Sequence, residues 1–150
     1  ENEDIDKLDK LISSVSNMMY AAKSIKDAVP DMEQLRNSSN DIKYNFYRQA
    51  GESVDEFCRK SYMFLNENTA HDIKKFIELY QSVTEKYTVT LQQLYKESTA
   101  GLVNETEITT LLNFNREIFT FFKSFLFGVK DYLYDREQSG YFDDLPGFIR

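Results

Sequence analysis

The sequence has little of the material from which turns are built. Its 150 residues include only five glycines and two prolines, a composition that favours a few long elements over many short ones. Cysteine is equally scarce. The single cysteine, Cys58, cannot form an internal disulfide, which fits a reducing compartment.

The residue sets typical of hydrolytic and nucleophilic enzymes are missing. The only histidine is His71, and no Cys–His or Ser–His–Asp set can be built around it. The sequence contains neither a glycine-rich phosphate loop nor a dinucleotide-binding fingerprint. We therefore expect a protein that is not an enzyme.

The net charge of −7 comes without any block of lysine or arginine. Nucleic acid is therefore not an expected partner, because neutralising its phosphates requires a basic face. The acidity suits solubility, or the binding of a cation or a basic partner.

No segment is apolar over a length sufficient to cross a membrane. The longest apolar run, residues 118–127, contains Lys123 and is too short to span a bilayer. The chain begins at Glu1 without a start methionine or the features of a signal peptide. We interpret it as a soluble piece of a larger protein that does not itself insert into a membrane.

The most regular feature of the sequence is an apolar stripe between residues 8 and 32. Its helical spacing predicts one face of a long helix, wide enough to pack against several neighbours, with Lys26 as the one polar intruder. The stripe keeps its phase across Pro30, so we predict a bent but continuous helix. Its members are Leu8, Leu11, Ile12, Val15, Met18, Met19, Ala22, Ile25, Val29 and Met32.

Three further segments show helical apolar spacing, and polar turn clusters separate them. Gly101 is a natural helix stop, and Asn104 with Glu107 resembles a capping box at the next helix start. Short connections force consecutive helices to run antiparallel, so we predict an all-α, up-down-up-down four-helix bundle. The predicted helices cover about residues 4–36, 40–66, 71–99 and 105–136 of a single domain over 1–137, and residues 138–150 form an irregular tail.

Two acidic pairs have the spacing of one helical turn. Asp27 and Asp31 lie beside the predicted bend, and Asp131 and Asp135 lie near the end of the fourth helix. Two like charges at this spacing destabilise a helix, and a cation could relieve them. The alternative is a solvated acidic face on which Lys23 or Lys130 compensates part of the charge.

The fourth predicted helix has more phenylalanine than one core face can hold. A second stripe of Phe114, Ile118, Phe121 and Phe125 lies off, or at the edge of, the main one. Such a stripe predicts contact beyond the bundle, with a second copy of the domain, a neighbouring segment or the membrane face of a parent protein. The alternative is a central helix that is buried on most sides.

Two polar residues fall on the predicted core faces. Asn115 lies on the stripe of the fourth helix and Lys26 on that of the first. They are the only sequence hints of a sensor domain that binds a small ligand in its core. A buried asparagine is more often a device that fixes helix register than a ligand contact.

Several segments carry a family resemblance. They are residues 21–27, 37–41 and 46–47 in the first half, and residues 111–117 and 129–133 in the second. They resemble the cytosolic C-terminal region of bacterial sodium/phosphate cotransporter family proteins, over roughly residues 8–135. That region is PhoU-like, an all-helical bundle fused after a membrane domain.

The resemblance implies regulation rather than catalysis. The partner would be the transmembrane transporter domain of the same polypeptide, which carries phosphate together with sodium, or a second copy in a homodimer. The location would be the cytoplasmic side of the bacterial inner membrane. PhoU proteins carry acidic E/D-x-x-x-D motifs that bind metal clusters, and Asp27 and Asp31 match this spacing.

Three functional hypotheses follow. The first is a soluble regulatory or interaction domain of a sodium-dependent phosphate transporter, without a cofactor. The second is a metal-binding, PhoU-like bundle that regulates phosphate signalling and holds a divalent or ferric metal at Asp27 and Asp31. The third is a generic helical sensor or protein-interaction domain.

Overall fold

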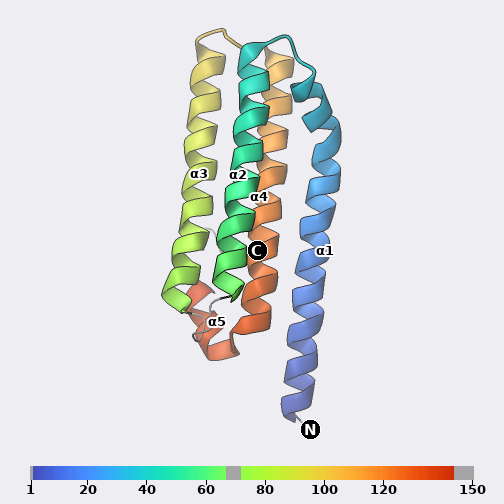
Figure 1. Ribbon diagram of the computed structural model, residues 1–150, viewed down its shortest axis with the longest axis vertical. Coiled ribbons are helices and arrows are strands. Elements are labelled where there is room, and N and C mark those ends of the chain that lie inside the picture. The colour runs from blue at the N-terminus through green and yellow to red at the C-terminus, as the bar shows by residue number, and fades with distance from the viewer. Residues whose placement is uncertain (1, 67–71, 144–150) are drawn as a thin grey trace.

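The computed structural model describes residues 2–66 and 72–143 of the chain, which form four long helices and one short one (Figure 1). The predicted all-α, up-down-up-down four-helix bundle is confirmed, and consecutive long helices run antiparallel. No helix within the described ranges has both the length and the apolar character needed to cross a bilayer. The helices are α1 (Asn2–Arg36), α2 (Asp41–Asn66), α3 (Ile73–Thr99), α4 (Glu105–Leu133) and α5 (Arg136–Asp143).

The helix ends follow the capping signals of the sequence. Asn104 and Glu107 form a reciprocal capping box at the start of α4, which satisfies two backbone N–H groups that have no partner within the helix. Gly101 adopts a φ of 73° after the end of α3, a backbone conformation that favours glycine. The helix start predicted at residue 71 lies outside the described residues.

α1 packs against α4 through small side chains. The buried positions of α1 are Ser14, Ala21, Ser24, Ala28 and Leu35, and the first four form what we call the small-residue line. Opposite this line, Gly128 of α4 has a backbone so close to α1 that an added Cβ would lie 2.8 Å from Met18 Cε and 3.1 Å from the Ser14 carbonyl oxygen. The two helices therefore share the most extensive helix–helix contact in the described structure.

This close approach turns much of the predicted core stripe of α1 toward solvent. Seven large apolar side chains, which we call the α1 apolar face, are exposed: Ile5, Leu8, Leu11, Ile12, Val15, Met19 and Val29. The prediction that this stripe packs into the bundle is therefore wrong for its six members in this set, Leu8, Leu11, Ile12, Val15, Met19 and Val29. The physical reason is that only the small-residue line allows the backbones of α1 and α4 to approach this closely. Continuity across Pro30, in contrast, is confirmed.

The core consists of two clusters, one toward each end of the bundle. The upper cluster contains Leu35 of α1, Phe46 of α2, Leu94 of α3 and Leu111 of α4. The lower cluster is rich in aromatic residues, among them Phe57, Phe76 and Phe122. α4 contributes to both clusters and is the helix around which the others are arranged.

The irregular tail predicted from residue 138 is wrong in its first part. The chain leaves α4 at Leu133 and begins α5 three residues later, and the described part of the tail is helical up to Asp143. Phe142 is fully buried, with its ring 5.2 Å from that of Phe76 and 5.9 Å from that of Tyr134. Burial of this one aromatic side chain anchors a segment whose own sequence carries weak helical signals.

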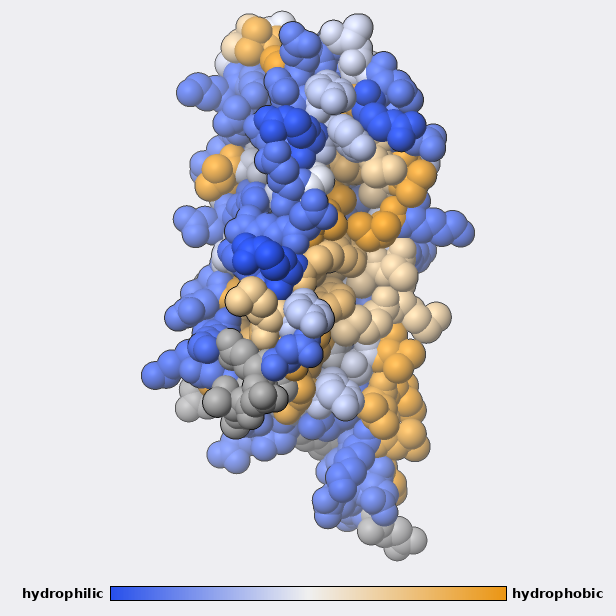
Figure 2. All heavy atoms as spheres, viewed as in Figure 1, coloured by the Kyte–Doolittle hydropathy of each residue, from blue (hydrophilic) through white to orange (hydrophobic). Residues whose placement is uncertain are grey.

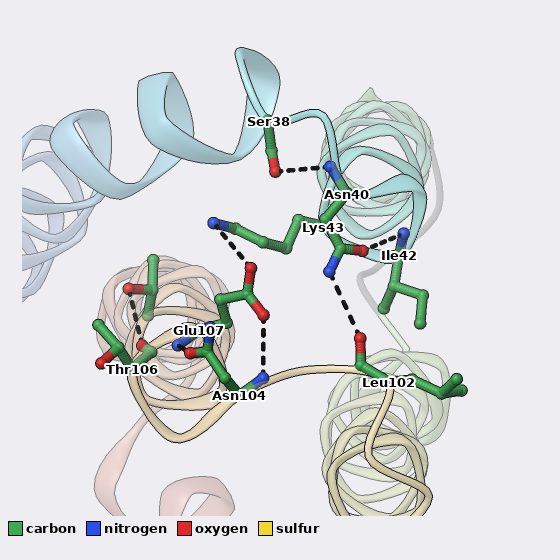
Figure 3. Close-up of polar contacts among 9 residues, drawn as sticks. Ser38, Asn40, Ile42, Lys43, Leu102, Asn104, Thr106 and Glu107 are labelled. Atoms are coloured by element: carbon green, nitrogen blue, oxygen red, sulfur yellow. Dashed lines mark hydrogen bonds and ion pairs between the residues drawn. The ribbon is translucent and has the colours of Figure 1, made fainter.

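The two upper connections meet in a polar cluster (Figure 3). Asn40 Nδ2 donates to the Leu102 carbonyl oxygen, so a side chain from the α1–α2 connection holds the α3–α4 connection. Lys43 is buried, and its Nζ lies 3.9 Å from Glu107 Oε1. Because Glu107 Oε2 also accepts from the Asn104 backbone N–H, one carboxylate both caps α4 and faces the Lys43 ammonium of α2.

Substitution of Gly128 will test the close contact of α1 with α4. We expect Gly128→Val to lower the free energy of unfolding by about 1–3 kcal/mol, since the added carbons meet Met18 and the Ser14 backbone. Gly51 is the control, because an added Cβ there meets nothing within 4 Å. Gly51→Ala should raise the free energy by up to about 1 kcal/mol. Urea unfolding monitored by circular dichroism measures both, and an unchanged midpoint for Gly128→Val would contradict the contact.

Glu107 offers a matched pair of substitutions. We expect Glu107→Ala to lower the free energy of unfolding by about 1–2 kcal/mol, because the capping box and the charge facing Lys43 are lost together. Glu107→Gln keeps a capping acceptor and should lose less. Thermal unfolding compares the two variants, and wild-type stability in Glu107→Ala would show that the cluster contributes nothing.

Candidate functional site

The acidic pair of α1 already has a cation beside it. Lys23 Nζ lies 2.7 Å from Asp27 Oδ2, and the hydrogen bond and charge of Asp27 raise the pKa of Lys23. Asp31 lies one turn further along and is partly buried. No group of three or more His, Cys, Asp or Glu side chains that could hold a metal ion occurs among residues 2–66 and 72–143. The metal site at Asp27 and Asp31 stays a prediction, and a metal there would compete with Lys23.

The second acidic pair is divided between two structural tasks. Asp131 Oδ2 accepts from Ser13 Oγ at 2.5 Å and from Asn17 Nδ2 at 2.9 Å, so it ties the lower part of α1 to α4. Asp135 lies beyond the end of α4, and its Oδ1 accepts from the Gln138 backbone N–H at 2.8 Å. The prediction that both carboxylates lie on α4 is wrong, because the helix ends at Leu133.

The predicted phenylalanine surface of α4 is only partly at the surface. Phe114 is 3 % exposed and packs edge-on against Phe46, so its assignment to an interaction surface is wrong. Phe121 and Phe125 are partly exposed, and their rings lie 5.8 Å and 5.5 Å from that of Phe57. Ile118 is partly buried between the two core clusters. α4 is therefore a central helix, and Phe121 and Phe125 lie at the edge of its buried surface.

Among residues 2–66 and 72–143, the longest run of exposed apolar side chains lies instead on α1. Figure 2 shows apolar residues along the edge of the molecule that α1 occupies. Ile5, Leu8, Ile12, Val15 and Met19 alternate at spacings of three and four residues, the repeat by which one helix pairs with another in a coiled coil. Contiguous exposed apolar side chains are typical of interaction surfaces, which makes this face of α1 the candidate site. The sequence pattern identified Leu8, Ile12, Val15 and Met19 but placed them in the core, and it did not include Ile5.

A cavity lies on the opposite side of α4, between α2, α3 and α4. It has a volume of about 80 Å³, and we call it the Asn115 cavity. It exists because α2 and α3 each contact α4 more than they contact each other. Its apolar wall includes Val83, Phe119 and Phe122, and the ring of Tyr87 stacks on Phe119 with 4.3 Å between centroids.

One buried polar group in this cavity has no partner. Asn115 is 8 % exposed and lines the cavity, and its Nδ2 makes no hydrogen bond within the described structure. Leaving a buried donor unsatisfied costs about 1–3 kcal/mol. The position of Asn115 on the core face was predicted from the sequence, but its lack of a partner could not be.

Lys86 is the charged residue that lines the Asn115 cavity, and Glu56 and Lys60 line a neighbouring hollow that shares Lys86. Lys86 lines the cavity, and its Nζ lies 3.6 Å from Glu56 Oε2. Glu56 Oε1 also lies 2.8 Å from Lys60 Nζ, so two ammonium groups share one carboxylate. The hydrogen bond and charge of Lys60, followed by the charge of Lys86, lower the pKa of Glu56. This local charge is opposite in sign to the net charge of the chain.

Comparisons of the chain with protein-family models, with curated proteins and with solved structures find no match.

Elemental analysis will test the predicted metal site. The hypothesis predicts stoichiometric divalent or ferric metal in the purified chain and its loss in Asp27→Asn/Asp31→Asn, because a neutral amide is a weaker ligand for a hard cation. Glu33→Gln, an exposed substitution on the same helix, is the control and should retain the metal. Metal at trace level in the wild-type chain would remove the hypothesis.

Proposed function

We propose that the chain is a non-catalytic helical interaction domain that docks through the α1 apolar face. We further propose, from the family resemblance, that it regulates a sodium-dependent phosphate transporter from the cytoplasmic side of the membrane. The single observation that carries the docking function is the exposure of seven large apolar side chains on one helix.

The geometry of the α1 apolar face favours a helical partner. A spacing of three and four residues presents a narrow apolar seam, which a second helix with the same repeat can cover along its length. The seam continues past Ala22 to Val29 and is interrupted by Lys26. Partners with such a seam include a second copy of the chain and a helix of the proposed transporter domain.

A partner that docks on α1 would act on the rest of the bundle through the contacts that hold α1 against α4. The small-residue line holds α1 against Gly128, and Asp131 holds it through Ser13 and Asn17. A partner that draws α1 away from α4 therefore strains these contacts, and one that presses α1 inward reinforces them. We propose that this coupling is how the bundle communicates with the transporter.

Two valines of nearly equal exposure provide the test of docking. Val15 on α1 is 57 % exposed and Val89 on α3 is 56 % exposed. With only the purified chain in solution, we expect association between copies through α1. Val15→Glu should weaken it at least tenfold because a charge enters an apolar seam, and Val89→Glu should leave it unchanged. Light scattering over a concentration series measures the association.

The regulatory part of the proposal needs the intact parent protein. In a transporter that contains this chain, Val15→Glu should change sodium-dependent phosphate uptake while Val89→Glu does not, at equal amounts of protein in the membrane. Unchanged uptake would contradict regulation through α1. Two results together would overturn the docking function as well. The purified chain would stay monomeric at all concentrations, and phosphate uptake by the transporter would not change with Val15→Glu.

A further inference from the structure

The Asn115 cavity is larger than an ordinary packing defect. Its volume is about 80 Å³, whereas one water molecule requires roughly 10–15 Å³ measured in the same way. It opens along the seam between α2 and α3, where the two helices have few contacts with each other. A second hollow along this seam shares Ser53, Lys86 and Phe122 with it. The cavity is therefore accessible from one side of the molecule.

Asn115 specifies one feature of an occupant. Its Nδ2 is a donor, and no described protein group accepts from it. The nearby residues on the same wall, Ile118, Phe119 and Phe122, have no side-chain acceptor to offer. A ligand that carries a carbonyl or ether oxygen at its inner end would satisfy the amide.

The aromatic lining of the cavity and Lys86 indicate two more features of a ligand. The phenylalanine and tyrosine rings that line the cavity present flat apolar surfaces, which suit a flat apolar ligand body. Lys86 lines the cavity, and it shares the carboxylate of Glu56 with Lys60 in the neighbouring hollow, so an anionic group at Lys86 would find an incompletely neutralised ammonium. A carboxylate pairs well with such a group.

We propose that the Asn115 cavity binds a small aromatic carboxylate, with its ring between α2, α3 and α4, its carboxylate at Lys86 and a second acceptor oxygen at Asn115. The arrangement follows the usual composition of small-molecule sites, in which apolar walls surround a few placed polar groups. The site lies across α4 from the α1 contact and does not use the α1 apolar face. It adds ligand binding to the proposed docking function and is independent of it.

Three related probes separate the contributions of the two polar contacts. 4-Acetylbenzoate carries both the carboxylate and the carbonyl acceptor, 4-isopropylbenzoate lacks the acceptor, and 4-acetylbenzamide lacks the charge. We expect saturable binding of 4-acetylbenzoate to the full chain, followed by amide chemical-shift changes on α2, α3 and α4. Each of the other two probes should bind at least tenfold more weakly.

Substitutions assign these contacts to residues. Asn115→Leu should fold well, since it removes an unsatisfied donor, and should weaken 4-acetylbenzoate at least tenfold while leaving 4-isopropylbenzoate unaffected. Lys86→Gln should weaken both carboxylates but not 4-acetylbenzamide. Asn113→Leu, on the same helix but outside the cavity lining, is the control and should bind like wild type. Val15→Glu should also bind like wild type, which separates this site from the docking function.

Two results would overturn the proposal. One is the absence of saturable binding of 4-acetylbenzoate at millimolar concentration in a wild-type chain shown to be folded by its amide spectrum. The other is binding that Asn115→Leu and Asn113→Leu affect equally, since the amide would then play no part in recognition.

Discussion

The approach of α1 to α4 at Gly128 is the constraint on which the rest of the structure depends. Ser14 Oγ donates to the Gly128 carbonyl oxygen at 2.7 Å, so a side chain of α1 is hydrogen-bonded to the backbone of α4 where the two helices pack. On the α1 side, Met18 and the Ser14 backbone lie closest to Gly128, and the buried positions of α1 other than Leu35 are serine and alanine. The rotation of α1 about its own axis is therefore fixed, and with it the set of α1 residues that solvent reaches.

This rotation produces a helix with two different faces. One face is narrow and is filled by serine and alanine, and it makes the contact with α4. The other carries isoleucine, leucine, valine and methionine, and these side chains are exposed in the part of the chain that the structure describes. A helix that only had to close a bundle would be expected to bury its large side chains and expose its small ones. The reverse arrangement is what makes α1 the candidate docking element.

The bounds of the four long helices could be predicted from the sequence, but the side of each helix that is buried could be predicted only in part. Helix bounds agreed within a few residues because they depend on local signals such as the Asn104 capping box. α5 was missed because its position depends on the burial of Phe142, which is a tertiary contact. The prediction for the apolar face of α1 was wrong because helical spacing shows only that the apolar residues share one face. It does not show whether that face packs inside the bundle. A second repeat, Ser14, Ala21 and Ala28 at intervals of seven, was present in the sequence and could have identified the α4 contact.

For the candidate sites too, the sequence predicted the features that depend on local spacing and missed those that depend on how the helices pack. Asn115 was placed correctly on a core face by periodicity, but its missing partner depends on the separation of α2 and α3, which no local pattern encodes. Phe114 has the same residue type as Phe121 and Phe125 but lies opposite Phe46, and only the position of α2 decides that it is buried.

Lys26 gives the α1 apolar face a property that an uninterrupted stripe would lack. A partner helix could lie on a uniform seam in several registers, each displaced from the next by one repeat, with similar energies. The single ammonium makes these registers unequal, because an apolar side chain opposite Lys26 would leave the charge partly desolvated. In the proposed docking, the lysine that interrupts the pattern would therefore determine where along α1 a partner helix lies.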